Sequence, residues 1–417
     1  MKGNLCVLGF TWGSVVAVFA PLALVIPALL TAAVVAYGTH PNWAQYDGGL
    51  ELIYLSRRLQ WPLVALCLGL CIGLIGMVVA GKQRAWWLIA LAPVLAMFVY
   101  RFSTRSLNAF QVLDNPTFVQ ADQADFVGAD DYVVGLRFGD EYYAYPYRAL
   151  YTRPVVIQQD HDRRMMLIWS AFCNRAMAVH IDRELKARDL EIVSMPANAL
   201  LLYNRRLGQF INGVTLQTRD GSTPTGVGAP IETQKMPWSR WRAMHPRTRV
   251  LSPPINRPAD PATPALPFYD MPPVVGEVLP PETRVVVVMT SPPIAIPTDR
   301  IRNDPMNLRA DQVPILLLRD RETGQIRAFD RRVEEDQTPT FRRNTDPSRR
   351  GVALVDSDTT IGWSATGRAV DGNPARRGMQ LTELPVETDL YWGVMKYWYP
   401  NLLLHQTDLI GDVRAPQ

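Results

Sequence analysis

Hydrophobic residues gather near the N-terminus in three long apolar runs. The runs cover residues 5–37, 61–80 and 86–100, and the second contains no charged residue. A bilayer core about 30 Å thick is crossed by roughly 20 helical residues, each of which rises 1.5 Å. The pattern therefore predicts three transmembrane helices within residues 1–100 and makes the lipid bilayer the first expected partner of the chain.

The ends and interruptions of these runs are typical of membrane-spanning helices. The first run is longer than needed and can bend at Pro21 and Pro27. The third is short, but Trp86, Trp87 and Tyr100 at its ends favour the membrane interfaces. A cleaved signal peptide is the alternative for the first run, although its apolar core would have only about 7–15 residues.

After residue 100 the pattern changes to short runs of β-branched and aromatic residues. They read DYVVGLRF, EYYAYPY, MMLIWSAF, TRVVVVM and VPILLLRD, with turn formers such as Gly139-Asp140, Asp220-Gly221 and residues 322–324 between runs. Such runs predict strands. The stretch 251–282 is dense in proline, which lacks a backbone donor and fixes φ, so we expect an extended connection there.

Segments on the two sides of this connection resemble each other. The similar pairs are 131–150 with 283–301, 178–184 with 327–333, 200–210 with 352–362, and 237–246 with 391–400. Recurrence of several segments in the same order indicates an internal duplication, with units near 121–250 and 283–405.

The last of these pairs predicts two short helices with aromatic faces. Trp238, Trp241 and His245 are spaced i, i+3 and i+7, and Trp392 and Tyr399 hold the first and last of these positions in the second segment. We expect all five residues to serve packing or interaction. For His245 an acid, base or ligand role is the alternative, but tyrosine at the matching position favours packing.

The predicted fold class is a mainly β (α+β) duplicated domain with short Trp-rich helices, preceded by an N-terminal bundle of three transmembrane α-helices. The predicted domains are an anchor at 1–100, a first β-rich unit at 101–250, a proline-rich connection at 251–282 and a second β-rich unit at 283–417.

Several motifs of this domain resemble the bacterial domain family of unknown function 3179. The motifs are AYPYRAL at 144–150, WSAFCNRA at 169–176, YNRRLGQF at 203–210, WSRWRAMHP at 238–246, FDRRV at 329–333 and DSDTTIGWSATGRAVDG at 356–372. The resemblance covers nearly all of residues 121–405. It implies a fold but no reaction, and its members look like exported or surface proteins, which implies a periplasmic domain.

One position departs from the family pattern. Where members carry a C-x-x-C pair, this chain has Ser170-Ala171-Phe172-Cys173. A metal clamp or disulfide formed by that pair is therefore not expected here. Cys173 is also the only cysteine after residue 72, so the domain cannot close an internal disulfide.

Charge adds little to the choice of partner or orientation. With 43 Lys and Arg against 39 Asp and Glu in 417 residues, the chain has no concentrated basic stretch, and no nucleic-acid partner is expected. For a cytoplasmic N-terminus, the basic residues on the inner side are Lys2, Lys82 and Arg84, and those outside are Arg57, Arg58, Arg101 and Arg105. The positive-inside rule therefore does not decide the orientation.

Two small groups of residues could carry chemistry. Cys173 with His180 and Asp182 could form a nucleophile, base and carboxylate set. In one extended strand, however, Cys173 and His180 would face opposite sides, and free cysteines are commonly buried. Residues 160–162, Asp160-His161-Asp162, could ligate a metal, but a polar hairpin turn between two strands is the alternative.

The chain contains no phosphate-binding loop, zinc-protease helix or nucleophile elbow, and no cofactor is predicted. The leading hypothesis is a membrane-anchored periplasmic binding or scaffold protein of the bacterial inner membrane. It would have protein partners in the membrane or periplasm, for example as an accessory subunit of an inner-membrane complex. The alternative is a periplasmic thiol- or metal-dependent enzyme that uses Cys173 and His180. Transport by the helices ranks last, because their apolar centres carry no ionisable residue.

Overall fold

The computed structural model describes residues 12–252, 278–321, 324–333, 337–372 and 377–405. Most of the predicted proline-rich connection (residues 253–277), the start of the first apolar run and turn residues 322–323 lie outside the described residues. The chain forms two compact units. The first comprises Met1–Pro116, Leu150–Leu167 and Val179–Ala229, and the second comprises Thr117–Ala149, Ile168–Ala178 and Pro230–Gln417.

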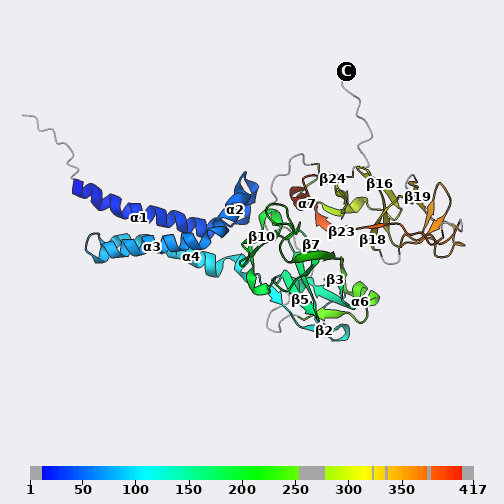
Figure 1. Ribbon diagram of the computed structural model, residues 1–417, viewed down its shortest axis with the longest axis horizontal. Helices are drawn as coiled ribbons and strands as arrows, with labels where there is room; N and C mark the ends of the chain where they lie inside the picture. The colour runs from blue at the N-terminus through cyan, green and yellow to red at the C-terminus, as the bar shows by residue number, and fades with distance from the viewer. Residues whose placement is uncertain (1–11, 253–277, 322–323, 334–336, 373–376, 406–417) are drawn as a thin grey trace, which may run out of the picture. The chain divides into compact units, whose positions relative to one another are not determined.

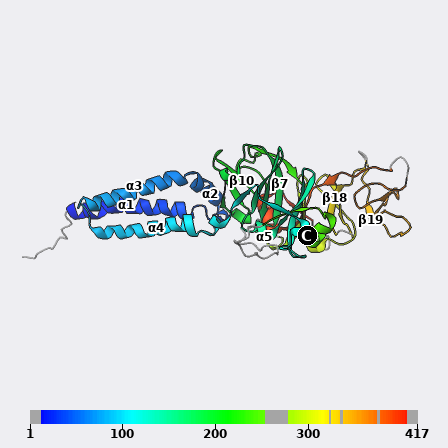
Figure 2. The same ribbon diagram turned by 90° about the horizontal axis from the view of Figure 1, so that it is seen from below.

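Three apolar helices begin the first unit. Helices α1 (Trp12–Tyr37), α3 (Gln60–Val79) and α4 (Leu91–Val99) lie side by side (Figures 1 and 2). Three segments have the length and apolarity to cross a membrane, namely Val18–Tyr37, Gln60–Val79 and Ala85–Ala109. The predicted apolar helices are therefore confirmed. The third segment is irregular, because α4 continues from the 3₁₀-helix η2 (Ala85–Ala90) and into the π-helical turn η3 (Tyr100–Thr104).

A further helix, α2 (Gly49–Arg58), lies between the first two apolar helices in sequence, where the hydrophobic pattern had predicted none. It follows the 3₁₀-helix η1 (Pro41–Gln45). Ile53 and Tyr54 on α2 are buried in an apolar cluster with Val193 and Phe210 of the β-rich part of the unit. The sequence GLELIYLSRR is an amphipathic helix that fastens the apolar helices to a sheet.

Two sheets lie largely in the first unit. One has the order β1-β5-β6-β7-β11 and the other the order β10-β9-β8. The strands are β1 (Val112–Asp114), β5 (Val155–Asp160), β6 (Arg163–Ser170), β7 (Arg175–Ile181), β8 (Leu190–Ser194), β9 (Leu201–Asn204), β10 (Gln209–Asn212) and β11 (Val227–Ile231). Short 3₁₀-helices connect them: η4 (Ser106–Ala109), η6 (Ala187–Asp189) and η7 (Pro196–Asn198).

The second unit begins with a five-stranded sheet in the order β12-β3-β4-β13-β2. Its elements are β2 (Phe118–Gln120), η5 (Ala121–Gln123), β3 (Tyr132–Phe138), β4 (Glu141–Pro146), α5 (Tyr147–Leu150), β12 (Thr233–Pro237), α6 (Trp238–Met244) and β13 (Arg249–Leu251).

Three smaller sheets complete this unit, with the orders β23-β14-β15-β24, β16-β17-β18-β22 and β19-β20-β21. Their elements are β14 (Arg284–Val288), β15 (Ile294–Pro297), η8 (Thr298–Arg300), β16 (Met306–Ala310), β17 (Val313–Arg319), β18 (Ile326–Asp330), β19 (Phe341–Arg343), β20 (Leu354–Asp356), β21 (Gly362–Trp363), β22 (Glu383–Leu384), β23 (Val386–Tyr391), α7 (Trp392–Trp398) and β24 (Leu403–Leu404). The five runs predicted as strands fall on β3, β4, β6, β14 and β17, so the strand-rich class is confirmed.

One connection pattern occurs twice in the second unit. The hairpin β3–β4 is flanked by antiparallel β12 and parallel β13, and the hairpin β14–β15 is flanked by antiparallel β23 and parallel β24. A short helix joins the two flanking strands in each case. The N–H of Trp238 on α6 donates to Asp131 O (2.7 Å), and that of Trp392 on α7 donates to Thr283 O (2.9 Å), just before each hairpin.

The core of the first of these sheets is built on a contact between a tryptophan and a glycine. Trp241 of α6 is buried with Val133 and Ala144. Its ring covers Gly135 of β3 so closely that an added Cβ would lie 2.4 Å from the indole Cε3. A side chain at position 135 would therefore displace the helix or the strand.

The Gly135→Ala substitution is expected to lower the free energy of unfolding by about 1–3 kcal/mol, the usual cost of overpacking. Thermal and denaturant unfolding of the full chain in detergent would measure it. Because the cost comes from the indole, the same substitution on a Trp241→Leu background should cost less. Equal losses on the two backgrounds would contradict the proposed contact.

Candidate functional site

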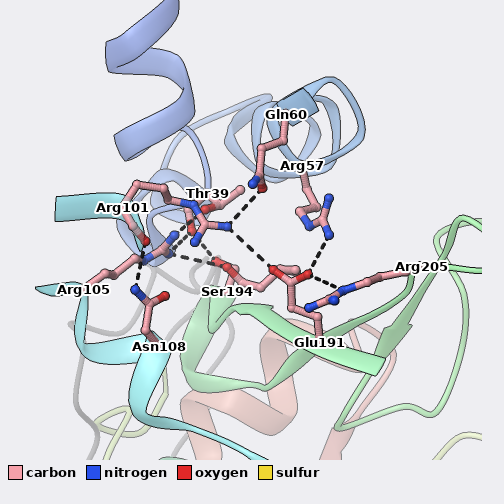
Figure 3. Close-up of polar contacts among 10 residues, drawn as sticks. Thr39, Arg57, Gln60, Arg101, Arg105, Asn108, Glu191, Ser194 and Arg205 are labelled. Atoms are coloured by element: carbon pink, nitrogen blue, oxygen red, sulfur yellow. Dashed lines mark hydrogen bonds and ion pairs between the residues drawn. The ribbon is translucent and has the colours of Figure 1, made fainter. Parts of the chain in front are cut away.

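Three arginines surround one glutamate where the apolar helices of the first unit meet the sheet β10-β9-β8. We call Arg57, Gln60, Arg101, Arg205 and Glu191 the Glu191 cluster (Figure 3). Glu191 Oε2 lies 2.6 Å from Arg57 Nη2 and 3.0 Å from Arg205 Nε, while Glu191 Oε1 lies 3.7 Å from Arg101 Nη2. Arg101 also donates to Gln60 Oε1 at 3.1 Å. The cluster thereby joins α2, α3 and η3 to strand β8.

The charges of this cluster do not balance. The side chains of Arg57 and Arg101 are only 6 % and 7 % exposed, and their sole carboxylate partner among the described residues is Glu191. Burial alone would raise the pKa of Glu191, but Arg57, Arg205 and Arg101 together hold it below its ordinary value. Glu191 is therefore ionised at neutral pH, and the cluster carries an excess of two positive charges.

A second set of contacts supports the joint between the apolar helices and the sheet β10-β9-β8. Arg105 is buried, and its Nη1 and Nη2 donate to Thr39 Oγ1 (2.5 Å) and Thr39 O (2.6 Å) (Figure 3). Ser194 Oγ at the end of β8 donates to the same Thr39 carbonyl at 2.8 Å. Arg105 and Ser194 thus satisfy the backbone carbonyl of Thr39 after α1 and fasten that helix end to strand β8.

The Glu191 cluster lines a pocket of about 390 Å³. Arg57, Arg101 and Arg205 give it a cationic wall, and the other lining side chains are Gln60, Trp61, Phe102, Leu107, Asn108, Phe110, Val112, Leu190, Glu191 and Ile192. The rings of Trp61 and Phe102 lie 6.3 Å apart and nearly parallel. A pocket with a cationic wall and an aromatic rim can hold an amphiphilic anion.

A second buried polar cluster lies entirely within the second unit. Arg175 at the start of β7 is fully buried. Its Nε and Nη2 each donate a hydrogen bond to one carboxylate oxygen of Glu387 on β23. Arg175 Nη1 also donates to Tyr399 Oη at 2.8 Å. Burial alone would lower the pKa of Arg175, but Glu387 and Tyr399 raise it above its ordinary value, so this arginine keeps its charge.

Lys235 on β12 adds a second buried cation beside this pair. Its Nζ donates at 2.5 Å to the backbone carbonyls of Asn174 and Thr388. Burial lowers the pKa of Lys235 to about 8, against the opposing effect of Asp389 and Glu387. The cluster therefore links β7 and β12 to β23 through buried charged groups.

The structure places Cys173 in the turn between β6 and β7 and buries it. Residues 168–182 are not one extended strand, because β6 ends at Ser170 and β7 begins at Arg175. Cys173 Sγ points to Ser170 O at 3.8 Å. Burial raises the pKa of the thiol, outweighing the opposite effect of Ser170 and Arg175. The thiol is thus protonated at neutral pH, which is unfavourable for a nucleophile.

The other predicted chemical residues lie at the surface of the first unit. His180 on β7 and Asp182 just after it are exposed. His161 is almost fully exposed in the turn between β5 and β6, with Nδ1 2.8 Å from Asp160 Oδ1, and Asp162 pairs with Arg183 at 2.7 Å. Among the described residues, no three His, Cys, Asp or Glu side chains are arranged to hold a metal ion.

The predicted packing residues occupy two environments. Trp238 and Trp241 are buried, and the His245 ring stacks on Tyr142 with centroids 3.8 Å apart. Burial lowers the pKa of His245, consistent with a neutral packed ring. In the second half Trp392 is buried on α7, while Tyr399 contacts Arg175 through its hydroxyl and its ring face.

Sequence reasoning missed the partners in both clusters. Arg57 and Arg101 read as charges that flank apolar helices, and Arg175 as a neighbour of Cys173. Two signals were present, a carboxylate at Glu191 inside the apolar strand LEIVS and another at Glu387 in VETDLY. Neither signal names its partner, because Arg57 and Glu191 are 134 residues apart and Arg175 and Glu387 are 212 apart.

Glu191→Gln is expected to lower the free energy of unfolding by about 2–4 kcal/mol, since it leaves buried guanidinium groups without an anion. The folded pKa lies below the ordinary 4.5, so this stabilisation is present above about pH 4.5 and is lost as pH falls through the folded pKa. Unfolding of the full chain in detergent at several pH values would measure both effects. Glu184→Gln, at an exposed pair with Arg206, is the control; a similar loss in both variants would contradict this role.

Lys235 is expected to make stability rise at alkaline pH. Its folded pKa of about 8 lies below the ordinary 10.5, so the charge is unfavourable below pH 8, and the penalty disappears as pH rises toward 10.5. Relative to Lys235→Met, the wild-type free energy of unfolding should increase by about 1–3 kcal/mol over that interval. A difference that stays constant with pH would show that Lys235 does not carry a buried charge.

Comparison with known proteins identifies the family of this chain. A family model described as "Protein of unknown function (DUF3179)" matches residues 109–402. No curated protein and no solved structure matches the chain significantly. The matched residues begin after the three apolar helices and include Glu191, Arg205 and the whole Arg175 cluster. Because the match covers well over half of the chain, this protein belongs to the DUF3179 family.

Proposed function

We propose that this chain is a membrane-anchored, non-catalytic binding or scaffold protein whose β-rich body lies in the periplasm of a bacterium. On this proposal the bilayer holds the three apolar helices, and the body presents a recognition surface to protein partners beside the inner membrane. An accessory subunit of an inner-membrane complex would have these properties.

The observation that carries the proposal is the joint between helices and body. The apolar helices belong to the same compact unit as strands β8, β9 and β10. Ile53 and Tyr54 pack on that sheet, and Arg57 binds Glu191 at 2.6 Å. A sheet joined by packing and buried ion pairs keeps a fixed distance and orientation to its anchor, which suits a scaffold better than a freely tethered enzyme.

Repeated local geometry supports an internal duplication of the body. The Asn204 side chain accepts from Arg206 N and Leu207 N, and the Asp356 side chain accepts from Asp358 N and Thr359 N, in turns between equivalent strand pairs. The recurring connection around α6 and α7 points the same way. Two similar halves would give the scaffold two related faces.

The described environments of the residues proposed for an enzyme site disfavour that alternative. Cys173 is buried with a raised pKa, and His180 and Asp182 are exposed. A thiol that reacts quickly with a water-soluble reagent in the folded chain at pH 7 would reverse this preference.

Purification of the full chain from native membranes in mild detergent is expected to recover a protein partner in a fixed ratio to this chain. The same ratio should return when the partner carries the tag. A C-terminal reporter fused to the full chain should be active on the periplasmic side.

An unrelated membrane protein with the same tag is the control for non-specific recovery. Recovery of this chain alone under several growth conditions would contradict the scaffold role. A reporter active only in the cytoplasm would contradict the orientation while leaving the anchor intact.

A further inference from the structure

We propose that the pocket of the Glu191 cluster binds the phosphate of an anionic phospholipid headgroup. This inference rests on the proposed membrane anchorage and adds a ligand class to it. The chemistry required is that of a phosphate ester anion, and the source that the site favours is a lipid.

Unmatched charge is the first argument. Arg57, Arg101 and Arg205 line the pocket together with one carboxylate, Glu191. Arg57 and Arg101 are nearly buried, and the Nε atom of each has no hydrogen-bond partner among the residues that the structure describes. Buried cations with unused donors are unfavourable unless an anion approaches them. Guanidinium groups match phosphate oxygens in both charge and geometry.

The second argument is the position of the pocket along the apolar helices. Gln60, which lines the pocket, is the first residue of α3, and the 20 residues of that helix extend about 30 Å, the thickness of a bilayer core. Arg101 follows α4, which runs back to the same end. The pocket therefore lies where α3 would enter the headgroup layer.

The rim of the pocket is the third argument. Trp61 is 64 % exposed and Phe102 is 43 % exposed, and they stack on each other at the ends of two apolar helices. Tyr37 and Tyr100 form a ring contact at 5.2 Å at the same end. Aromatic side chains in such places favour the interface between lipid tails and water. A free phosphate would use the arginines alone, whereas a phospholipid would use the arginines and the rim.

Arg205 offers a variant that leaves the joint intact. Its side chain is 58 % exposed, so Arg205→Gln removes one charge from the pocket without creating a buried unpaired group. Arg206→Gln is the matched control, because the neighbouring Arg206 is 45 % exposed, also pairs with carboxylates, and does not line the pocket.

The test uses the full chain, purified and delipidated in a non-ionic detergent. Phosphatidylglycerol, phosphatidylcholine and inorganic phosphate would be titrated separately, with native mass spectrometry and the thermal unfolding midpoint as readouts. We expect phosphatidylglycerol to be retained and to raise the midpoint, and phosphatidylcholine to do neither. Arg205→Gln should weaken retention roughly fivefold or more, and Arg206→Gln should leave it unchanged.

Each other outcome overturns the inference in a distinct way. Equal retention of both lipids would exclude headgroup recognition, and equal losses in the two variants would exclude this pocket. Displacement of the lipid by millimolar phosphate would assign the pocket to soluble phosphate compounds. Failure of the chain to stay in membranes washed with alkaline carbonate would instead contradict the anchorage on which the proposed function rests.

Discussion

The pairing of Arg57 with Glu191 is the contact on which the attachment of the apolar helices to the sheet β10-β9-β8 depends. The apolar packing of Ile53 and Tyr54 holds α2 on this sheet but is non-directional, so it does not fix how the helices meet the sheet. The ion pair fixes that geometry, because each guanidinium taken from water requires an anion at hydrogen-bond distance. Glu191 serves Arg57, Arg101 and Arg205 at once, which makes it the least replaceable residue of the joint.

The second unit also contains buried cations, and different residues compensate their charge. Arg175 binds Glu387 and Tyr399, more than 200 residues away in the sequence, and Lys235 donates to the backbone carbonyls of Asn174 and Thr388. These contacts adjoin the turn of Cys173, so hydrogen bonds and an ion pair hold the residues that follow this buried thiol.

The sequence was sufficient for features that depend on neighbours along the chain. Apolar runs predicted the three apolar helices, runs of β-branched and aromatic residues predicted strands such as β3 and β17, and i, i+3, i+7 spacing predicted α6 and α7. Helix α2 was missed because its apolar face lies between two much stronger apolar signals. The Glu191 and Arg175 clusters were missed for a different reason. Burial of a charge is visible in a sequence only through its partner, and these partners are more than a hundred residues away.

The same arginines explain why the charge distribution does not decide the orientation of the helices. Of the four basic residues at the body end of the helices, Arg57, Arg101 and Arg105 have partners in the folded chain. The positive-inside rule acts on the chain as it inserts, before those partners form. The arginines that bind Glu191 and Thr39 therefore add positive charge at the end of the helices that the proposed orientation places outside the cytoplasm. In that orientation the export of the domain would depend on something other than loop charge, consistent with the weak effect of flanking charge on large domains.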